Sequence, residues 1–437
     1  MNYLSSTDLR TIKVLEQAEF PSKVNARNKV VEDTAKLIKE LGIKDNAVLS
    51  FHHHLRNGDY VLNTIMKEVQ RQGIKGITLV ASSLFPIHAE MIPLLEDGTI
   101  ENIVTSYISG DLGRAISYGK LKGKIIMQSH GGRARSILNG EIEIDVAFIA
   151  SPSADAHGNI SGVNGHNTCG TLGYAIADSL KAKKVVAVTD ALVEYPNYPA
   201  DITEDYVDYV LVIDCIGRKE GIVSGTTRVT RDPVGLKIAK DTLKVMEATG
   251  LLKEGFSYQS GAGGISLAVT AFLKEYMIEN NIKGSFASGG ITGHLTQMLE
   301  EGLFSALFDV QCFDLESIES LKRNPNHIRM SASQYGNPEV SAVVDKLDFV
   351  ILGATEIDVN FNVNVTSGAD GVLMGGSGGH QDTAAGSKVS IIVSKLFSSR
   401  IPVIKDRVDV ITTPGTTVDV LVTERGICVN PLRTDLI

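Results

Sequence analysis

The residues best suited to chemistry begin with three histidines and an arginine in the segment SFHHHLRNGD: His52, His53, His54 and Arg56. Imidazole and guanidinium groups can bind the carboxylates or phosphates of an anionic substrate. A single metal ion is a poorer fit, because adjacent side chains of an extended segment point in opposite directions. Anion binding and a purely structural role both stay open for this run, and we expect no metal site.

The segment SHGGR offers a second candidate for anion binding through His130 and Arg133. The planar guanidinium of Arg133 can hold a carboxylate through two hydrogen bonds. The alternative is an ordinary surface arginine, since exposed arginines are common. We predict that both side chains contact substrate.

Two glycine-rich segments could bring backbone N–H groups close to a ligand. The first, SGAGGIS, contains Gly261, Gly263 and Gly264 and precedes a helical stripe of apolar residues. It therefore lies at a helix N-terminus, where unpaired N–H groups can hold an anion or a developing oxyanion. Its spacing does not match the dinucleotide-binding fingerprint GxGxxG, and a simple tight turn is the alternative.

The second glycine-rich segment is denser and is followed by Asp382. Five glycines fall within nine positions: Gly371, Gly375, Gly376, Gly378 and Gly379. Glycine loses more conformational freedom on folding than any other residue, so such a concentration favours a function in ligand approach.

Alternating helices and strands must position these segments. Apolar periodicity predicts helices over residues 27–41 and 61–73, each ended by glycine. Short, almost uniformly apolar runs are typical of parallel strands buried on both faces, and they occur at 146–150, 185–188, 210–213, 349–352, 391–393 and 418–422. We therefore expect an α/β protein with two open, mainly parallel sheets that binds ligands beyond the carboxyl ends of the strands.

The chain also carries two copies of one pattern. Residues 74–76 lead to His88 in the first copy, and residues 282–284 lead to His294 roughly two hundred residues later. So long a period indicates two domains rather than a solenoid.

The length of 437 residues likewise exceeds what a single core usually supports. We predict an N-terminal domain over 1–226 and a C-terminal domain over 227–437. The loop at His52 and the loop at Gly261 fall at corresponding places in the two copies, so we expect both to face one active cleft.

Composition excludes several classes of function. The formal charge of −9 disfavours nucleic-acid binding. No apolar run approaches the roughly 18 residues of a membrane span, and the first ten residues lack the apolar core of a signal peptide. We expect a cytoplasmic protein with no membrane partner. The four cysteines lie far apart without a CxxC pair, which predicts reduced thiols.

Longer segments give the chain a specific resemblance to the citrate lyase alpha chain family, the citrate CoA-transferase subunits of that complex. The segments are SFHHHLRNGD from Ser50, SHGGR from Ser129, DVAFIASPSADAHGN from Asp145, RNPNHI from Arg323, GATEIDVNFNVNV from Gly353, DGVLMGGSGGHQDTA from Asp370 and RIPVIKDRVDVITTPGTTVDVLVTERGICVNP from Arg400. The resemblance spans nearly the whole chain and implies two homologous CoA-transferase-type α/β halves.

The resemblance implies that a citrate carboxylate displaces acetate from an acetyl thioester, giving a citryl thioester. Acetyl-CoA or an acyl carrier (gamma) subunit with a CoA-like prosthetic group would be the co-substrate, and no cofactor would be bound covalently to this chain. A citryl lyase (beta) subunit would cleave the product, and a homo-oligomer is expected.

Alternatives to citrate transfer remain open. Citramalate could be the acceptor, the chain could be a non-catalytic module that binds sugar phosphates or other anions, or it could merely scaffold a lyase.

Within this interpretation we assign the candidate residues to three roles. Substrate contact is assigned to His52, His53, Arg56, His130 and Arg133, catalysis to Gly261, Gly263, Gly264 and Glu356, and thioester binding to Gly375, Gly376, Gly378, Gly379 and Asp382.

The better-known CoA-transferases of this fold form a thioester on a glutamate within a Gly-His-x-Glu-Met type of motif. The similar segment here, GHLTQM, carries Thr296 and Gln297, and neither side chain can form that intermediate productively. Glu90 in the first copy and Glu356 are the remaining carboxylates of interest, each with a structural role as the alternative. We therefore hypothesise direct transfer through a mixed anhydride in a ternary complex.

Overall fold

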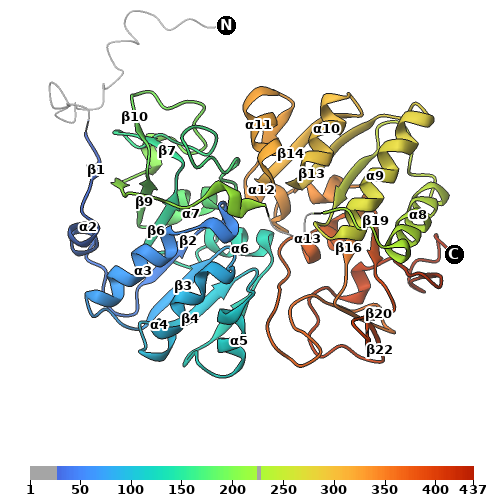
Figure 1. Ribbon diagram of the computed structural model, residues 1–437, viewed down its shortest axis with the longest axis horizontal. Helices are drawn as coiled ribbons and strands as arrows, with labels where there is room; N and C mark the ends of the chain where they lie inside the picture. Colours follow the sequence, from blue (N-terminus) through green and yellow to red (C-terminus); the bar gives the residue numbers. More distant parts are fainter. Residues whose placement is uncertain (1–26, 224–227) are drawn as a thin grey trace, which may run out of the picture.

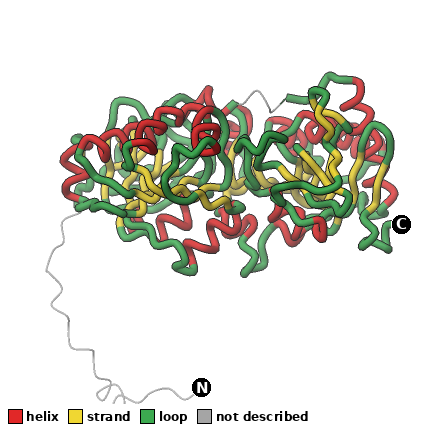
Figure 2. Tube along the Cα trace, turned by 90° about the horizontal axis from the view of Figure 1, so that it is seen from below, coloured by secondary structure: helices red, strands yellow, loops and turns green. Residues whose placement is uncertain are grey.

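Two eight-stranded sheets lie side by side in the computed structural model, which describes residues 27–223 and 228–437 (Figure 1). Helices cover both sides of the strand layer (Figure 2). This is the arrangement expected of parallel sheets, whose connections must cross from one end of a strand to the start of the next.

The first sheet is parallel throughout, in the order β1-β11-β9-β6-β2-β3-β4-β5. Its strands are β1 Val30–Val31, β2 Val48–Phe51, β3 Ile77–Ala81, β4 Ile100–Thr105, β5 Ile125–Met127, β6 Val146–Ala150, β9 Lys184–Thr189 and β11 Tyr209–Val212.

The second sheet has the order β15-β14-β13-β12-β16-β19-β23-β24, and only β23 and β24 pair antiparallel. Its strands are β12 Ser257–Ser260, β13 Gly284–Ile291, β14 Phe304–Cys312, β15 His327–Arg329, β16 Phe349–Gly353, β19 Val389–Val393, β23 Val420–Val422 and β24 Ile427–Val429.

Apart from the edge strands β1 and β24, the two sheets, read in opposite directions, repeat one connectivity. β2 and β12 are central, and the next three strands of each unit follow on one side. Each unit also carries a three-stranded sheet. These are β7 Ser153–Asp155, β8 Ile160–Ser161 and β10 Leu192–Val193, and β17 Glu356–Asp358, β18 Val363–Asn364 and β22 Ile404–Lys405. β20 Phe397–Ser398 and β21 Ile401–Pro402 form a separate pair. The predicted fold class is confirmed.

The helices connect successive strands. Those packed with the first sheet are α2 Thr34–Glu40, α3 Val61–Arg71, α4 Ile92–Glu96, α5 Asp111–Ser117, α6 His130–Leu138 and α7 Ala175–Lys181. The second half contains α8 Pro233–Ala248, α9 Gly264–Glu279, α10 Gly293–Glu300, α11 Leu315–Arg323, α12 Ala332–Gly336 and α13 His380–Gly386. None of the helices in the described ranges is both long and apolar enough to cross a membrane.

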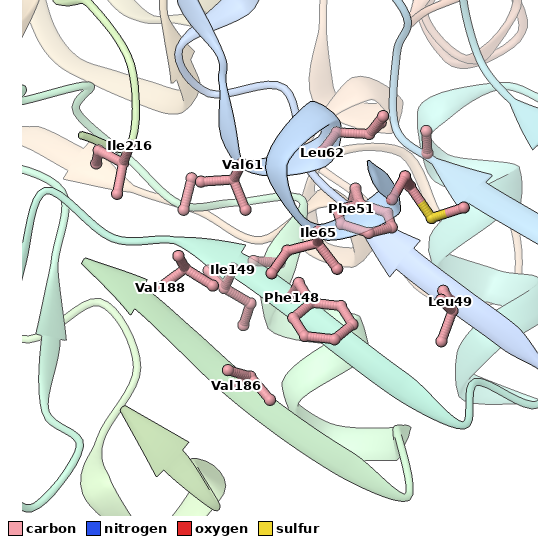
Figure 3. Close-up of a cluster of buried hydrophobic side chains, with 14 of the residues drawn as sticks. Leu49, Phe51, Val61, Leu62, Ile65, Phe148, Ile149, Val186, Val188 and Ile216 are labelled. Carbon is pink, nitrogen blue, oxygen red and sulfur yellow. The ribbon is translucent and has the colours of Figure 1, made fainter. Parts of the chain in front are cut away.

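The core of the first unit explains why α3 lies where it does. Val61, Leu62 and Ile65 recur on one face of the helix and are fully buried against the sheet (Figure 3). Beneath them, Phe51 of β2 stacks on Phe148 of β6 with 5.4 Å between ring centroids. This packing fixes the end of β2, which leads directly into the histidine run.

A second apolar cluster joins the two halves. Tyr174, Ala177 and Ile137 of the first half pack there with Tyr335 and Met330 of the second, all of them buried. Both sheets are thereby held with their carboxyl ends directed at a shared region.

The predicted strands are confirmed within one or two residues at each end, and the helix predicted over 61–73 corresponds to α3. The helix predicted over 27–41 is wrong at its start. Val30 and Val31 form β1 alongside β11, and the helix begins only at Thr34, where the Asp33 carboxylate accepts from the Lys36 N–H at 2.9 Å. The domain boundary near residue 226 stays a prediction, since residues 224–227 lie outside the described part of the chain.

Candidate functional site

A cavity of about 470 Å³ lies where the carboxyl ends of β2, β3 and β4 meet those of β12, β13, β14 and β16. Both halves contribute to its walls, as expected for a ligand site of open parallel sheets. The lining residues are His53, Arg56, Ser83, Phe85, Tyr107, His130, Tyr174, Gln259, Ser260, Gly261, Ala262, Gly263, Gly290, Val310, Gln311, Phe313, Tyr335, Leu352, Gly353, Ala354, Thr355, Val365, Gly376, Ser377, Gly378, Gly379 and His380.

His53 and His130 form one aromatic wall of the cavity together with Tyr174. The two imidazole rings lie 4.6 and 4.4 Å from the Tyr174 ring, centroid to centroid. His53 Nδ1 lies 2.6 Å from the Ser82 hydroxyl, which also accepts the His53 backbone N–H. The side chain is therefore held with its Nε2 edge toward Ser83, another lining residue.

His52 and Arg133 do not line this cavity. Both point at Asp178 of α7, which His52 Nε2 approaches to 3.0 Å and Arg133 contacts through two hydrogen bonds of 2.8 and 3.0 Å. Burial alone would raise the pKa of Asp178, but Arg133 and His52 outweigh it and hold that pKa below its usual range. The bidentate grip predicted for Arg133 thus exists, with a carboxylate of the protein itself as its partner.

Arg56 is the single Lys or Arg among the residues that line the cavity in the described part of the chain. Its guanidinium carbon lies 4.5 Å from the centre of the Phe313 ring and 5.5 Å from that of Phe85. Cation–π contacts of this kind hold the side chain between two aromatic rings. The backbone of Arg56 has φ of 52°, an uncommon value for a residue with a side chain.

The SGAGGIS segment ends β12 and begins α9, as predicted. Gly261 and Gly263 line the cavity, whereas Gly264 lies in the first turn of the helix just beyond it. Among the described residues, neither the N–H of Ala262 nor that of Gly263 donates to another protein group. Within the described ranges these two groups are free to donate to a ligand, and the N-terminus of a sixteen-residue helix favours an anion there.

The dense glycine segment contributes Gly376, Gly378 and Gly379 to the cavity, while Gly375 lies behind it. The His130 N–H donates to the Gly378 carbonyl at 2.8 Å, so this segment is attached to the start of α6 in the other half. Two of these positions do not tolerate a side chain: a Cβ on Gly379 would collide with the Tyr335 hydroxyl, and one on Gly376 with the Ser106 carbonyl.

Asp382 lies in the first turn of α13, outside the cavity, and bridges to the other half by accepting the Gly131 N–H at 2.9 Å. Burial raises its pKa to about 7, because the surroundings disfavour the charged form more than Ser129 and Gly131 stabilise it. This carboxyl therefore joins the start of α6 to the end of the glycine segment rather than facing a ligand.

Glu356 also lies outside the cavity, in the small sheet. Its carboxylate accepts from the Asn364 amide at 2.9 Å and pairs with Lys405 at 3.3 Å. Its neighbour Thr355 does line the cavity. Glu356 can thus act on the site only through the backbone of β17.

Thr296 and Gln297, together with Glu90, are likewise remote from the cavity. Gln297 is exposed on α10 and bonds Glu316, and Glu90 pairs with Lys67 on the surface. The absence of a carboxylate at positions 296 and 297 therefore says nothing about the reaction. The lining itself is informative: across the described ranges, no Asp, Glu, Cys or Lys side chain faces the cavity.

Several lining residues were not singled out from the sequence. Gln259 donates to the Tyr335 hydroxyl at 2.9 Å, and Gln311 donates to the His53 carbonyl at 3.0 Å. His380 bonds the Gly353 carbonyl through Nε2 at 2.8 Å, so Nε2 carries the proton and Nδ1 accepts from Thr413. Only His380 had a sequence signal, because it directly follows the glycine segment.

The histidines of the site are neutral in the ligand-free protein. Burial lowers the pKa of His130 to about 3, with Arg133 adding to the effect, and lowers that of His380 to about 4. Burial, followed by the neighbouring His130, also lowers the pKa of His53. An anion in the cavity would meet Arg56 and backbone N–H groups rather than imidazolium ions.

These shifts predict that the ligand-free protein loses stability as the pH falls from about 6.5 toward 4. Over that range the unfolded chain, with ordinary histidine pKa values near 6.5, takes up protons that folded His130 and His380 refuse. Urea titrations at pH 6.5, 5.5 and 4.5 should give a free energy of unfolding that becomes smaller at each lower pH.

The matched variant is His130→Gln, which should have a shallower pH dependence over the same interval. Equal slopes for the two proteins would show that His130 titrates normally in the folded state.

Three comparisons with known proteins bear on this site. A family model described as citrate lyase, alpha subunit (CitF) matches residues 27–437. The citrate lyase alpha chains of Haemophilus influenzae and Escherichia coli are each 44% identical, over 98% and 100% of this chain and 86% of each relative.

Among solved structures, the alpha subunit of citrate lyase from Streptococcus mutans, in complex with citrate, superposes with a TM-score of 0.92. It is 47% identical and is matched over 96% of this chain and 82% of that chain. The malonate decarboxylase alpha subunit of Acinetobacter baumannii has a TM-score of 0.70 at 15% identity, over 92% and 82% of the two chains, and shares the fold.

Proposed function

The chain belongs to the family of citrate lyase alpha subunits, and from this premise we propose that its central cavity transfers the thiol carrier of an acetyl thioester to citrate. The family match confirms the resemblance found in the sequence. The alpha chain is the citrate CoA-transferase subunit of citrate lyase.

The observation that carries the proposed mechanism is the lack of a carboxylate among the lining residues of the described chain. A glutamyl or aspartyl thioester needs such a group within reach of the acyl carbon. The attacking carboxylate must then come from citrate. It adds to the acetyl carbonyl and expels the thiolate, which leaves a citryl–acetyl anhydride. The thiolate next attacks the citryl carbonyl and releases acetate, so the thioester bond broken in the first step is replaced in the second.

Each step passes through a tetrahedral oxyanion that needs preorganised donors. We assign this role to the N–H groups at Gly261–Gly264, because those of Ala262 and Gly263 lie at a helix N-terminus and have no partner among the residues that the structure describes. Citrate contact is assigned to Arg56, His53 and His130. The thioester is assigned to the wall formed by Gly376, Gly378 and Gly379, where the lack of side chains permits close approach of a flat acyl group.

The other candidate residues act at a distance in this proposal. Asp178 of α7 holds His52 and also Arg133, which lies on α6, while Asp382 fixes the glycine segment to the start of α6. Glu356 positions Thr355. They are positioning residues, since none lines the cavity.

Membership of the family implies a complex with other citrate lyase subunits. We propose further that the donor is acetyl-CoA or the acetylated prosthetic group of a gamma (acyl carrier) subunit, that a beta (citryl lyase) subunit consumes the product, and that the chain forms homo-oligomers in the cytoplasm.

Direct transfer predicts sequential kinetics. Initial rates measured by mass detection of citryl-CoA should give intersecting double-reciprocal lines, because both substrates must be bound before any product leaves. Enzyme incubated with acetyl-CoA alone should retain no hydroxylamine-sensitive acyl group.

Parallel lines together with a trapped acyl-enzyme would overturn the direct mechanism. Citramalate tested in place of citrate distinguishes the two acceptors, and no exchange with either would instead favour a scaffold or binding module.

A further inference from the structure

Three side chains of metal-ligand type meet in the protein interior, away from the cavity walls. Asp309 and Cys312 belong to β14 and His327 begins β15, and one ligand atom from each lies within 4.8 Å of the other two. The Cys312 sulfur and His327 Nε2 lie 2.9 and 3.3 Å from the same oxygen, Asp309 Oδ2. At most 3% of each residue's surface is exposed.

Hydrogen bonding within the described chain leaves this cluster incomplete. Asp309 Oδ1 and His327 Nε2 are both buried without a hydrogen-bond partner there. Buried polar atoms are rarely left in this condition, because each one costs free energy. Two such atoms in one cluster indicate that a partner is missing from it.

The surroundings of His327 indicate the sign of that partner. Its Nδ1 lies 3.1 Å from the Ser320 hydroxyl, which can itself donate to Glu300 at 3.5 Å. If Ser320 accepts the Nδ1 proton, Nε2 carries a lone pair 3.3 Å from an Asp309 carboxylate oxygen. Two electron-rich atoms 3.3 Å apart are stabilised by a cation between them.

We propose that Asp309, Cys312 and His327 form a structural site for one borderline divalent transition-metal ion, with Zn²⁺ as its best fit. Sulfur, imidazole nitrogen and carboxylate oxygen together suit Zn²⁺, whereas Mg²⁺ and Ca²⁺ take oxygen ligands. Two ligands about 2.0 Å from a tetrahedral ion lie about 3.3 Å apart, as His327 Nε2 and Asp309 Oδ2 do. The sulfur would have to move outward by about half an ångström.

Neighbouring groups form hydrogen bonds to the proposed ligands, as they do around metal ions in other proteins. Thr171, from the first half of the chain, donates its hydroxyl to Asp309 Oδ2 at 3.1 Å, and Ser320 orients the His327 ring. The fourth tetrahedral position would be taken by water or by the Thr171 hydroxyl. Burial, with Asp309 adding to it, raises the pKa of Cys312. Metal binding must therefore replace the S–H bond by a metal–sulfur bond and release one proton.

The position of the site gives it a consequence for the cavity. Val310, Gln311 and Phe313 line the cavity from the same strand end, where Gln311 donates to the His53 carbonyl and Phe313 lies against Arg56. An ion at Asp309 and Cys312 would therefore hold the wall that supports both substrate-binding side chains. This inference does not depend on the proposed reaction.

The test uses the whole chain refolded in Zn²⁺ or Co²⁺, because a site this deeply buried must load before the fold closes. We expect about one ion per chain by elemental analysis after dialysis, and a cobalt–thiolate absorption band in the Co²⁺ form. Cys312→Ala should lose both signals. Cys169→Ala, which removes another buried thiol outside the cluster, should keep both.

A wild-type chain that refolds without retaining metal would overturn the proposal, as would an undiminished cobalt–thiolate band in Cys312→Ala. If Cys312→Ala does not fold, His327→Gln provides the second variant, and retention of a full equivalent of tightly bound ion by it would count against the site. Refolding in Zn²⁺ should also raise the urea midpoint of the wild type and not that of either variant.

Discussion

Replacing Gly378 with valine should lower kcat/KM for citryl thioester formation by at least about 100-fold in a protein that still folds. The backbone there has φ of +52°, and a Cβ would project toward His130 Nε2, at 3.5 Å. The two methyl groups of valine would then occupy the space between the glycine wall and the imidazole. A displacement of about 1 Å of a reacting group can cost 100-fold in rate, so an obstruction of this size should be nearly complete.

The matched control is Gly371→Val in the same segment. Gly371 also has a positive φ, of 76°, but it is exposed and nothing lies within 4 Å of an added Cβ. Both variants therefore carry a similar backbone strain of about 1–2 kcal/mol, and only one obstructs the cavity. Thermal unfolding would verify that the two proteins are equally folded. Normal turnover by Gly378→Val would remove this wall from the acyl site.

The sheets and the loops after their strands could be predicted from the sequence because the relevant signals are local. Runs such as 146–150 are apolar without alternation, which is what burial on both faces requires. The glycine segments can be recognised from their composition alone. The error at residues 27–41 is also local: the pair Val30–Val31 lies where a helical stripe was expected, and its parallel pairing with β11, far along the chain, outweighs helix propensity.

The functional assignment of side chains was harder because it depends on partners distant in the sequence. Arg133 and His52 both have side chains that suit an anion site. Both nevertheless contact the carboxylate of Asp178, which lies on α7. Tyr174, Tyr335 and Phe313 line the cavity from segments that carry no motif at all. Packing between the two halves decides which side chains point into the cleft. The pattern of a single sequence does not contain that information.

The second large effect is expected at Arg56. Arg56→Ala should raise KM for citrate by about 10- to 150-fold, which corresponds to the roughly 1.5–3 kcal/mol of a charged hydrogen bond. The reason is electrostatic: the histidines beside it are neutral, so Arg56 is the only formal positive charge that the described lining offers to a trianion. KM for acetyl-CoA should change less, because the acyl end of that substrate is uncharged.

Two further variants separate the causes of this effect. Arg56→Lys keeps the charge but loses the planar group that lies against Phe313, so it should recover citrate binding only in part. Arg135→Ala removes an arginine outside the cavity that pairs with Glu141, and it should leave both KM values unchanged. An unaltered citrate KM in folded Arg56→Ala would mean that the backbone N–H groups at Ala262 and Gly263 hold the substrate without this side chain, and the anion site would then belong to the helix terminus alone.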